Sequence, residues 1–126
     1  MNVYDGVEEY RLLKFRAFFD GKFYYSDSQE SGRELGARPG QSICGVFWSR
    51  FVGMGIIDQF TGLTDQDNRE IYDGDIYEMF GQVHMIIAVY THGLRFMWGD
   101  EQLTNAITKY GIYRGNVHEN TGVLSK

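Results

Sequence analysis

The sequence is short of cysteine, of proline and of long apolar runs, and each shortage excludes a class of protein. Its single cysteine, Cys44, cannot form an internal disulfide, which is typical of proteins in a reducing compartment. No apolar run approaches the roughly 18 residues that a membrane-spanning helix needs, and the first residues lack the apolar segment of a signal peptide. We therefore expect a soluble, cytoplasmic protein with no membrane partner.

Basic residues are also in the minority, with 12 Lys and Arg against 17 Asp and Glu and a net charge of −5. Because affinity for nucleic acid comes largely from neutralising phosphates, such a chain is a poor candidate for non-specific DNA binding. One alternative stays open, because the first predicted strands place cations beside aromatic side chains, as single-strand binding surfaces do. These cations are Arg11, Lys14, Arg16 and Lys22. Solvent-facing positions on a half-buried hairpin explain them better in an acidic protein.

Proline occurs once, whereas glycine occurs 16 times and aromatic residues make up 16% of the chain. Aromatic side chains favour pleated, half-buried surfaces, and glycine supplies the positive φ that hairpin turns require. The composition thus predicts a β-rich fold. At 126 residues the chain has the common size of one domain. We therefore expect a single domain over residues 1–126 with one hydrophobic core.

A hairpin is predicted near the start of the chain. Residues 11–19 and 22–25 flank Asp20-Gly21, a pair that accepts the backbone conformation of a tight hairpin turn. Residues 26–42 are polar and predict a long surface loop with one helical turn near residues 33–35.

The segment 43–52 is ambiguous. Its aromatic and β-branched content favours a strand, although the same apolar positions would also suit a short buried helix. We predict a strand.

The second half of the chain predicts an antiparallel meander of short strands. The expected strands cover residues 56–60, 75–80, 83–90, 94–98 and 110–118, with turns at Gly81-Gln82 and at residues 91–93. The polar residues 99–108 have room for one helical turn. Because both faces of residues 83–90 are apolar, we expect a central strand, covered by the rest of the chain on one side and by a neighbouring subunit on the other.

The densest cluster of special residues is QFTGLTDQDNREIYDGDIYE, residues 59–78, which predicts three strands separated by two turns. Gly62 and Gly74 stand where strands turn or where backbones approach closely. Asp65 and Asp75 are expected to accept hydrogen bonds from backbone N–H groups in the adjacent turns. The core side chains of this stretch are expected to be Leu63, Ile71 and Ile76. This structural interpretation explains the cluster without a ligand.

Metal-binding patterns fail when they are tested on these acids. A calcium loop that begins at Asp65 needs an oxygen ligand, a glycine and a glutamate at its fifth, sixth and twelfth positions. The chain has Arg69, Glu70 and Ile76 there. A weak divalent-ion site of Asp73, Asp75 and Glu78 is the remaining alternative. The scattered histidines 84, 92 and 118 do not have zinc-ligand spacing, so we predict no metal and no cofactor.

Catalytic patterns are equally weak, and we predict no catalytic residue. Cys44 paired with a histidine would make a nucleophile, but a lone cysteine in an apolar run is more often inert packing. The sequence has no Walker motif, dinucleotide-binding glycine loop or nucleophile elbow. An enzyme is therefore the least favoured of three hypotheses for this chain, after a protein-binding protein and a nucleic-acid-binding module.

Three stretches together resemble the YopX-like family of phage and prophage proteins. They are Lys14–Phe18, the run from Gln59 to Asp65 with Glu70–Ile76, and Gly115–Asn120. The chain departs from the family pattern in three places. Asp67-Asn68 replaces Asn-Gly, Asp73 replaces Glu, and residues 121–124 replace Pro, Glu and two Leu.

The resemblance implies an all-β fold: a small antiparallel SH3-like barrel, with its core at about residues 56–120, an N-terminal β-hairpin extension and a long polar loop. It also implies a phage or prophage setting in a bacterial host cell, and it implies no activity. The residues that carry the family motif are expected to be structural. They are Gln59, Thr61, Gly62, Leu63, Asp65, Ile71, Tyr72, Gly74, Asp75, Gly115, Asn116, Glu119 and Asn120.

The sequence therefore predicts a non-enzymatic phage accessory protein that acts by binding protein. The partner is either a second copy of the chain, which would make a homo-oligomer, or a host or phage protein. A small nucleic-acid-binding β-barrel is the alternative function. The aromatic surfaces outside the motif are the expected location of either activity.

Overall fold

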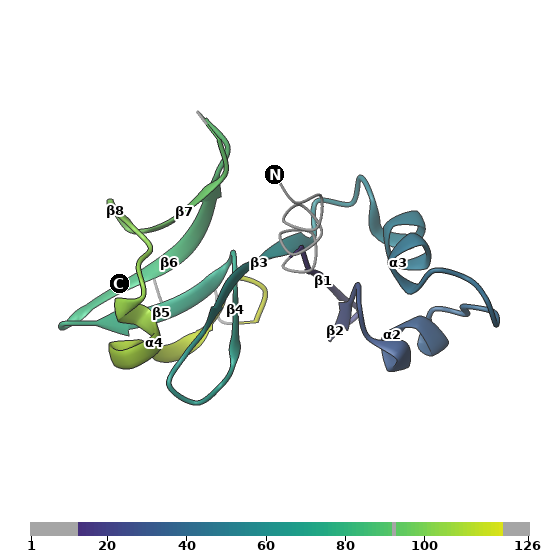
Figure 1. Ribbon diagram of the computed structural model, residues 1–126, viewed down its shortest axis with the longest axis horizontal. Helices are drawn as coiled ribbons and strands as arrows, with labels where there is room; N and C mark the ends of the chain where they lie inside the picture. The colour runs from purple at the N-terminus through teal and green to yellow at the C-terminus, as the bar shows by residue number, and fades with distance from the viewer. Residues whose placement is uncertain (1–12, 92, 120–126) are drawn as a thin grey trace, which may run out of the picture. The chain divides into compact units, whose positions relative to one another are not determined.

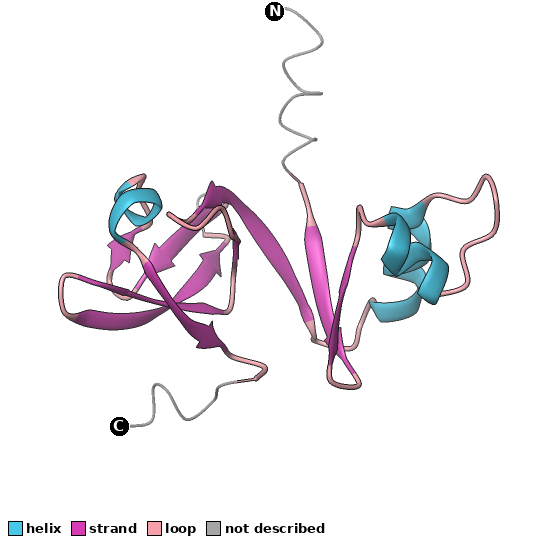
Figure 2. Cartoon of the chain, turned by 90° about the horizontal axis from the view of Figure 1, so that it is seen from below, coloured by secondary structure: helices cyan, strands magenta, loops and turns pink. Residues whose placement is uncertain are grey.

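The structure is a computed structural model that describes residues 13–91 and 93–119. The chain forms two compact units, Met1–Gln59 and Phe60–Lys126. The first unit combines an antiparallel hairpin with two short helices, and the second consists mostly of antiparallel strands (Figures 1 and 2). The described chain is therefore mostly β with few and short helices, which confirms the all-β prediction.

The first unit contains the predicted hairpin. Strands β1 (Phe15–Phe19) and β2 (Lys22–Tyr25) are antiparallel partners, and the turn residues Asp20 and Gly21 have φ of 53° and 77°. Both values are positive, as the tight turn requires. On its other side β1 pairs with the beginning of β3 (Ile57–Thr64), so that Arg16 lies opposite Asp58.

Two helices follow the hairpin in the places where a loop and a strand were predicted. Helix α2 (Gln29–Glu34) occupies part of the polar segment, which is therefore not one long loop. Helix α3 (Ile43–Phe51) occupies the segment 43–52, and the strand prediction there is wrong. The side chain of Ser42 caps α3 by accepting a hydrogen bond from the Gly45 N–H at 3.1 Å. The cap at the start of α3 and the four-residue spacing of its buried side chains, which places them on one helical face, together outweigh the β propensity of this segment.

The core of the first unit lies between α3 and the hairpin. Phe47 and Phe51, one helical turn apart, are fully buried with Ala17 of β1. Aromatic rings pack edge-on in this cluster, with centroids 4.8 Å apart for Phe15 and Trp48. The aromatic residues of the segment 43–52 thus form the inner face of a helix.

The second unit is built on a five-stranded antiparallel sheet with the order β8-β7-β6-β5-β9. The strands are β5 (Asp75–Met79), β6 (Gln82–Val89), β7 (Arg95–Trp98), β8 (Glu101–Gln102) and β9 (Ile112–Asn116). The strand β6 is central in this sheet, as predicted, and its covering by a neighbouring subunit stays a prediction. The end of β3 pairs with β4 (Glu70–Tyr72), and a short helix α4 (Ala106–Tyr110) precedes β9. The stretch 59–78 therefore has the three strands and two turns that its sequence predicts.

The hairpin between β5 and β6 turns one residue earlier than predicted. Met79 lies opposite Gln82, and the turn residues are Phe80 and Gly81, with φ of 53° and 78°. Glycine at the second position satisfies this turn, and Phe80, a residue that is 74% exposed, takes the strained first position. Of the predicted turn at residues 91–93, residue 92 lies outside the described part of the chain.

A second hydrophobic cluster fills this unit, in place of the one core that the chain length predicts. Its buried members are Ile71, Tyr77, Met79, Ile86, Trp98 and Ile107. Leu63 packs against the cluster, and Ile76 is 1% exposed, so the three predicted core residues of the central stretch are placed correctly. The assignment of residues 1–126 to a single domain stays a prediction.

Within the described residues, no helix has the length and apolar content that crossing a membrane requires.

Candidate functional site

Asp65 organises the loop between β3 and β4. Its Oδ1 accepts hydrogen bonds from the backbone N–H groups of Asp67 (2.8 Å) and Arg69 (3.0 Å), as the sequence predicted. Its Oδ2 accepts a hydrogen bond from the hydroxyl of Tyr77 at 2.7 Å. Asn68 occupies the left-handed conformation in this loop, with φ of 62°. The carboxylate therefore fixes both the loop and a core tyrosine.

Tyr77 is fully buried, and its hydroxyl has a strongly altered acidity. Burial, followed by the hydrogen bond to Asp65, raises the pKa of Tyr77 far above its ordinary value near 10. Tyr77 therefore keeps its proton in the folded protein at a pH where the unfolded chain releases it.

This pKa difference predicts an alkaline loss of stability. The contribution of Tyr77 is complete below pH 10 and declines as the pH rises further, because the unfolded state then binds fewer protons. Relative to a Tyr77→Phe variant, the free energy of unfolding should fall by about 1.4 kcal/mol for each pH unit above 10. Urea denaturation of both proteins across the alkaline range measures this difference. Parallel pH profiles would contradict it.

The second motif turn is held by Asp75, which is fully buried. Its Oδ2 accepts a hydrogen bond from the Tyr72 N–H at 2.8 Å, again as predicted. Gly74, with φ of 92°, donates its N–H to the carbonyl of Ile86 and accepts from the Val117 N–H, at 2.7 and 2.8 Å. This turn thus connects β4 and β5 to two other parts of the unit.

The remaining motif residues also engage in local contacts. Asn116 accepts hydrogen bonds from the N–H groups of His118 and Glu119 and donates to Glu119 and to the hydroxyl of Tyr113. The Thr61 hydroxyl donates to the carbonyl of Ile71 at 2.8 Å. The structure places Gln59, Tyr72 and Gly115 in buried positions and Gly62 in an exposed one with φ of 86°. Asn120 lies outside the described residues.

The acids of the motif do not come together as metal ligands. Across residues 13–91 and 93–119, no group of three His, Cys, Asp or Glu side chains is arranged to hold a metal ion. Asp75 faces the backbone of Tyr72, and Glu78 pairs with Arg114 at 2.6 Å. The alternative site of Asp73, Asp75 and Glu78 is therefore not formed.

The candidate residues for other chemistry are dispersed. His84 packs edge-on against the indole of Trp98, with ring centroids 4.8 Å apart. His92 lies outside the described residues. Cys44 is exposed on α3, whereas the apolar run around it predicted a packed thiol.

The cations of the first hairpin are paired with carboxylates. Lys14 lies 3.2 Å from Asp27, and Lys22 pairs with Glu34, whose hydrogen bond raises the pKa of Lys22. The guanidinium of Arg16 pairs with Asp58 at 2.9 Å and also covers the ring of Phe23. Arg11 lies outside the described residues. Within the described hairpin these charges are already balanced, which disfavours it as a nucleic-acid surface.

One face of the five-stranded sheet is lined by aliphatic side chains. Residues directly opposite each other in an antiparallel pair share a face, and the pairings of β5, β6, β7 and β9 place six apolar residues together, beside Glu78 and the buried Ile76. We call this set the aliphatic face: Val83, Met85, Ile87, Val89, Met97 and Ile112. Ile87 and Ile112 are 44% and 42% exposed, and the other four are half-buried.

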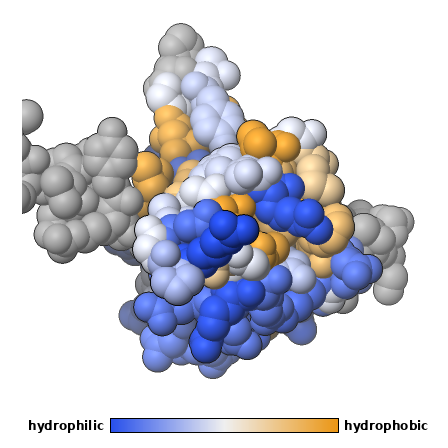
Figure 3. Space-filling model, turned by 90° about the vertical axis from the view of Figure 1, so that its right-hand side faces the viewer, coloured by the Kyte–Doolittle hydropathy of each residue, from blue (hydrophilic) through white to orange (hydrophobic). Residues whose placement is uncertain are grey.

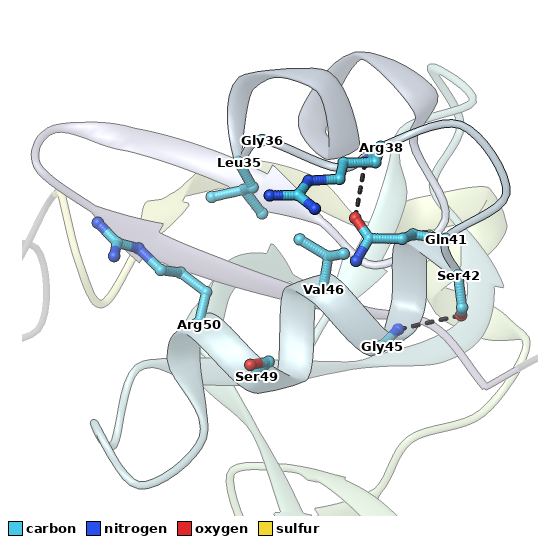
Figure 4. A pocket seen from close by; sticks show the side chains of 9 residues that line it. All are labelled: Leu35, Gly36, Arg38, Gln41, Ser42, Gly45, Val46, Ser49 and Arg50. Atoms are coloured by element: carbon cyan, nitrogen blue, oxygen red, sulfur yellow. Dashed lines mark hydrogen bonds between the residues drawn. The ribbon is translucent and has the colours of Figure 1, made fainter.

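A pocket of about 600 Å³ lies in the first unit, between α3 and the segment that joins it to α2. Figure 4 shows the Arg38 side chain reaching across this pocket above Val46, with Arg50 at the end opposite Ser42. Figure 3 views the side on which α2 and α3 lie in Figure 1, where strongly hydrophilic side chains surround smaller apolar areas. We call this cavity the arginine pocket, and its lining residues are Leu35, Gly36, Arg38, Gln41, Ser42, Gly45, Val46, Ser49 and Arg50.

Sequence reasoning missed the arginine pocket, although a signal was present. Residues 35–57 contain Arg38 and Arg50 and not one aspartate or glutamate, in a chain that is acidic overall. An uncompensated cationic segment in an acidic protein is a sign of an anion-binding surface.

Comparison with known proteins identifies the family to which these features belong. No curated protein matches the chain. The model of a family described as YopX protein matches residues 14–125, a range that includes all three stretches that carry the resemblance. The chain therefore belongs to the YopX family.

Proposed function

We propose that the protein is a non-enzymatic phage accessory protein that acts in the bacterial cytoplasm by binding protein, and first of all a second copy of itself. The aliphatic face carries this proposal. The outer face of an antiparallel sheet is ordinarily polar, whereas β6 presents four apolar residues in succession on this side. Contiguous apolar surface of this kind marks protein–protein contacts.

The apolar character of this face favours a second copy as the partner. Glu78, which lies between Val83 and Ile112, is already paired with Arg114 at 2.6 Å, and Arg95 lies opposite Val89 at the far end of β6. In a two-fold symmetric dimer the same patch packs against itself, so the aliphatic side chains of one copy would meet those of the other. Face-to-face packing of two sheets buries apolar side chains in this way.

Two further features support the remaining parts of the proposal. The motif carboxylates Asp65 and Asp75 are engaged in backbone hydrogen bonds, which supports a structural role for the motif and a non-enzymatic protein. The second unit is a meander of short antiparallel strands, and its last strand returns to lie beside β5. This arrangement around one buried cluster supports an SH3-like barrel.

Light scattering tests self-association directly. We expect the full chain to form a dimer at micromolar concentration, and Ile87→Glu to shift it to monomer, because a charge would then be buried without a partner. Val52→Glu is the matched control. Val52 is an apolar residue of the first unit that is 63% exposed, and the same charge there should leave the dimer intact.

Two results would contradict the proposal. A wild-type chain that stays monomeric throughout the micromolar range would exclude self-association. A dimer that persists in Ile87→Glu would show that association uses another surface.

A further inference from the structure

The arginine pocket offers hydrogen-bond donors and no competing carboxylate. Among the described residues, neither Arg38 nor Arg50 forms an ion pair. Arg50 does have one aromatic contact, with its guanidinium 5.8 Å from the ring centroid of Phe19. Guanidinium groups that are not neutralised within the protein are the groups that bind carboxylate or phosphate in two parallel hydrogen bonds.

Local hydrogen bonds orient the other polar groups of the pocket as donors. The Oε1 of Gln41 accepts a hydrogen bond from the Arg38 N–H at 2.7 Å, which leaves its NH₂ group for a ligand. The Oγ of Ser42 accepts from the Gly45 N–H at 3.1 Å, so its own proton is free to be donated. Figure 4 shows both of these hydrogen bonds at the edge of the pocket. The ligand must therefore be rich in acceptors.

The apolar part of the lining distinguishes between classes of anion. Leu35 and Val46 lie between the two arginines, and the lining contains no aromatic side chain. Binding sites for single-stranded nucleic acid stack bases on aromatic rings and use many cations. An aliphatic patch between guanidinium groups instead matches a peptide in which aliphatic and acidic side chains are neighbours.

A second hollow extends the same surface. It has a volume of about 430 Å³, shares Arg38 and Gln41 with the arginine pocket, and adds Arg33, Pro39 and Ile43 to the lining. Arg33, like the other two arginines, has no ion pair among the described residues. Because the two hollows share Arg38 and Gln41, they adjoin each other and offer room for more than one side chain of a ligand.

We propose that the arginine pocket binds an acidic peptide segment of a partner protein, with its carboxylates on Arg38 and Arg50 and an aliphatic side chain against Leu35 and Val46. The site lies in the first unit and uses none of the residues of the aliphatic face. It is therefore independent of self-association, and a monomeric protein would still have it.

Fluorescence anisotropy tests the proposal with a short labelled peptide of alternating glutamate and leucine, titrated with the full chain. We expect saturable binding that weakens as salt is added. Arg38→Gln and Arg50→Gln should each lower the affinity about tenfold, the loss expected for one charge-assisted contact. Arg95→Gln removes the same charge from the second unit, and Ile87→Glu disrupts the aliphatic face. Both variants should bind like the wild type.

Three outcomes would overturn the proposal. If the same peptide with glutamine in place of glutamate bound equally well, carboxylate recognition would be excluded. An equal loss of affinity in Arg95→Gln would show that peptide binding depends on the net charge of the protein and not on the arginine pocket. If single-stranded DNA bound more tightly than the peptide, and if this binding depended on Arg38, the pocket would be assigned to phosphate recognition. Arg38 and Arg50 are exposed, so matched melting temperatures of their variants will show that the fold is retained.

Discussion

Replacing Asp58 with alanine is expected to lower the free energy of unfolding by about 3–5 kcal/mol, the range for breaking a buried ion pair from one side. The Oδ2 of Asp58 lies 2.9 Å from the Nε of Arg16, and their side chains are only 9% and 6% exposed. The pair also connects β1 to β3, because the two residues lie directly opposite each other in the sheet. Urea denaturation, with an unchanged slope, measures the loss.

An exposed ion pair of the same unit provides the control. Lys14 and Asp27 are 3.2 Å apart, but the Asp27 side chain is 50% exposed. Asp27→Ala should therefore cost less than about 1 kcal/mol. If Asp58→Ala were no more costly than Asp27→Ala, the Arg16 guanidinium would not be left as an uncompensated buried charge, and the expected range would be wrong.

The matched apolar replacement separates the ion pair from the packing around it. Arg16→Met combined with Asp58→Leu removes both charges and keeps much of the volume. Buried ion pairs replaced in this way are often neutral for stability. We therefore expect the double variant to recover most of the loss of Asp58→Ala. A double variant as unstable as the single one would show that the charges also serve contacts beyond their mutual pair.

Turns were predictable from the sequence where the local chemistry has one favourable outcome. Asp20-Gly21 both take positive φ, and few other pairs do so without strain. Asp65 follows β3 and Asp75 begins β5, and both carboxylates face nearby backbone N–H groups, so their hydrogen bonds needed no tertiary information. The turn between β5 and β6 was predicted one residue too late, at Gly81-Gln82, because phenylalanine rarely takes the positive φ that Phe80 has.

Helix α3 was not predictable from composition, because its residues suit two structures. Its valine, isoleucine and aromatic residues favour strands. The spacing of Phe47 and Phe51 instead places both rings on one helical face, against Ala17 and the hairpin. Only because that hairpin is present does a helix bury the aromatic residues of this segment better than a strand would.

The cationic composition of the arginine pocket was visible in the sequence, but its cavity was not predictable, for a related reason. Arg38 precedes α3 and Arg50 lies in its last turn, so their shared cavity exists only once α3 is a helix. The pairing of Arg16 with Asp58 likewise depends on β1 meeting β3. The cations of the hairpin were therefore predicted as candidates for a nucleic-acid surface, whereas Arg38 and Arg50, which form no ion pair among the described residues, were not.

Replacing Asp65 with alanine is expected to lower the free energy of unfolding by about 3 kcal/mol. The change leaves the buried hydroxyl of Tyr77 without its acceptor, which costs about 1–3 kcal/mol. It also removes the acceptor for the N–H groups of Asp67 and Arg69, a loss comparable to that of a helix cap, about 0.5–2 kcal/mol. Urea denaturation at neutral pH measures the sum.

Two further variants divide this loss between the loop and the core. Asp65→Asn keeps an acceptor oxygen for the loop and presents an NH₂ group to the Tyr77 hydroxyl, which can accept from it. Its loss should be smaller, at about 1 kcal/mol. Tyr77→Phe removes the hydroxyl alone, so combining it with Asp65→Ala should cost less than the sum of the two single changes. Additive losses would show that the loop and the tyrosine are independent. The carboxylate of Asp65 would then be a loop residue only, and the motif would no longer join the turn after β3 to the core of the sheet.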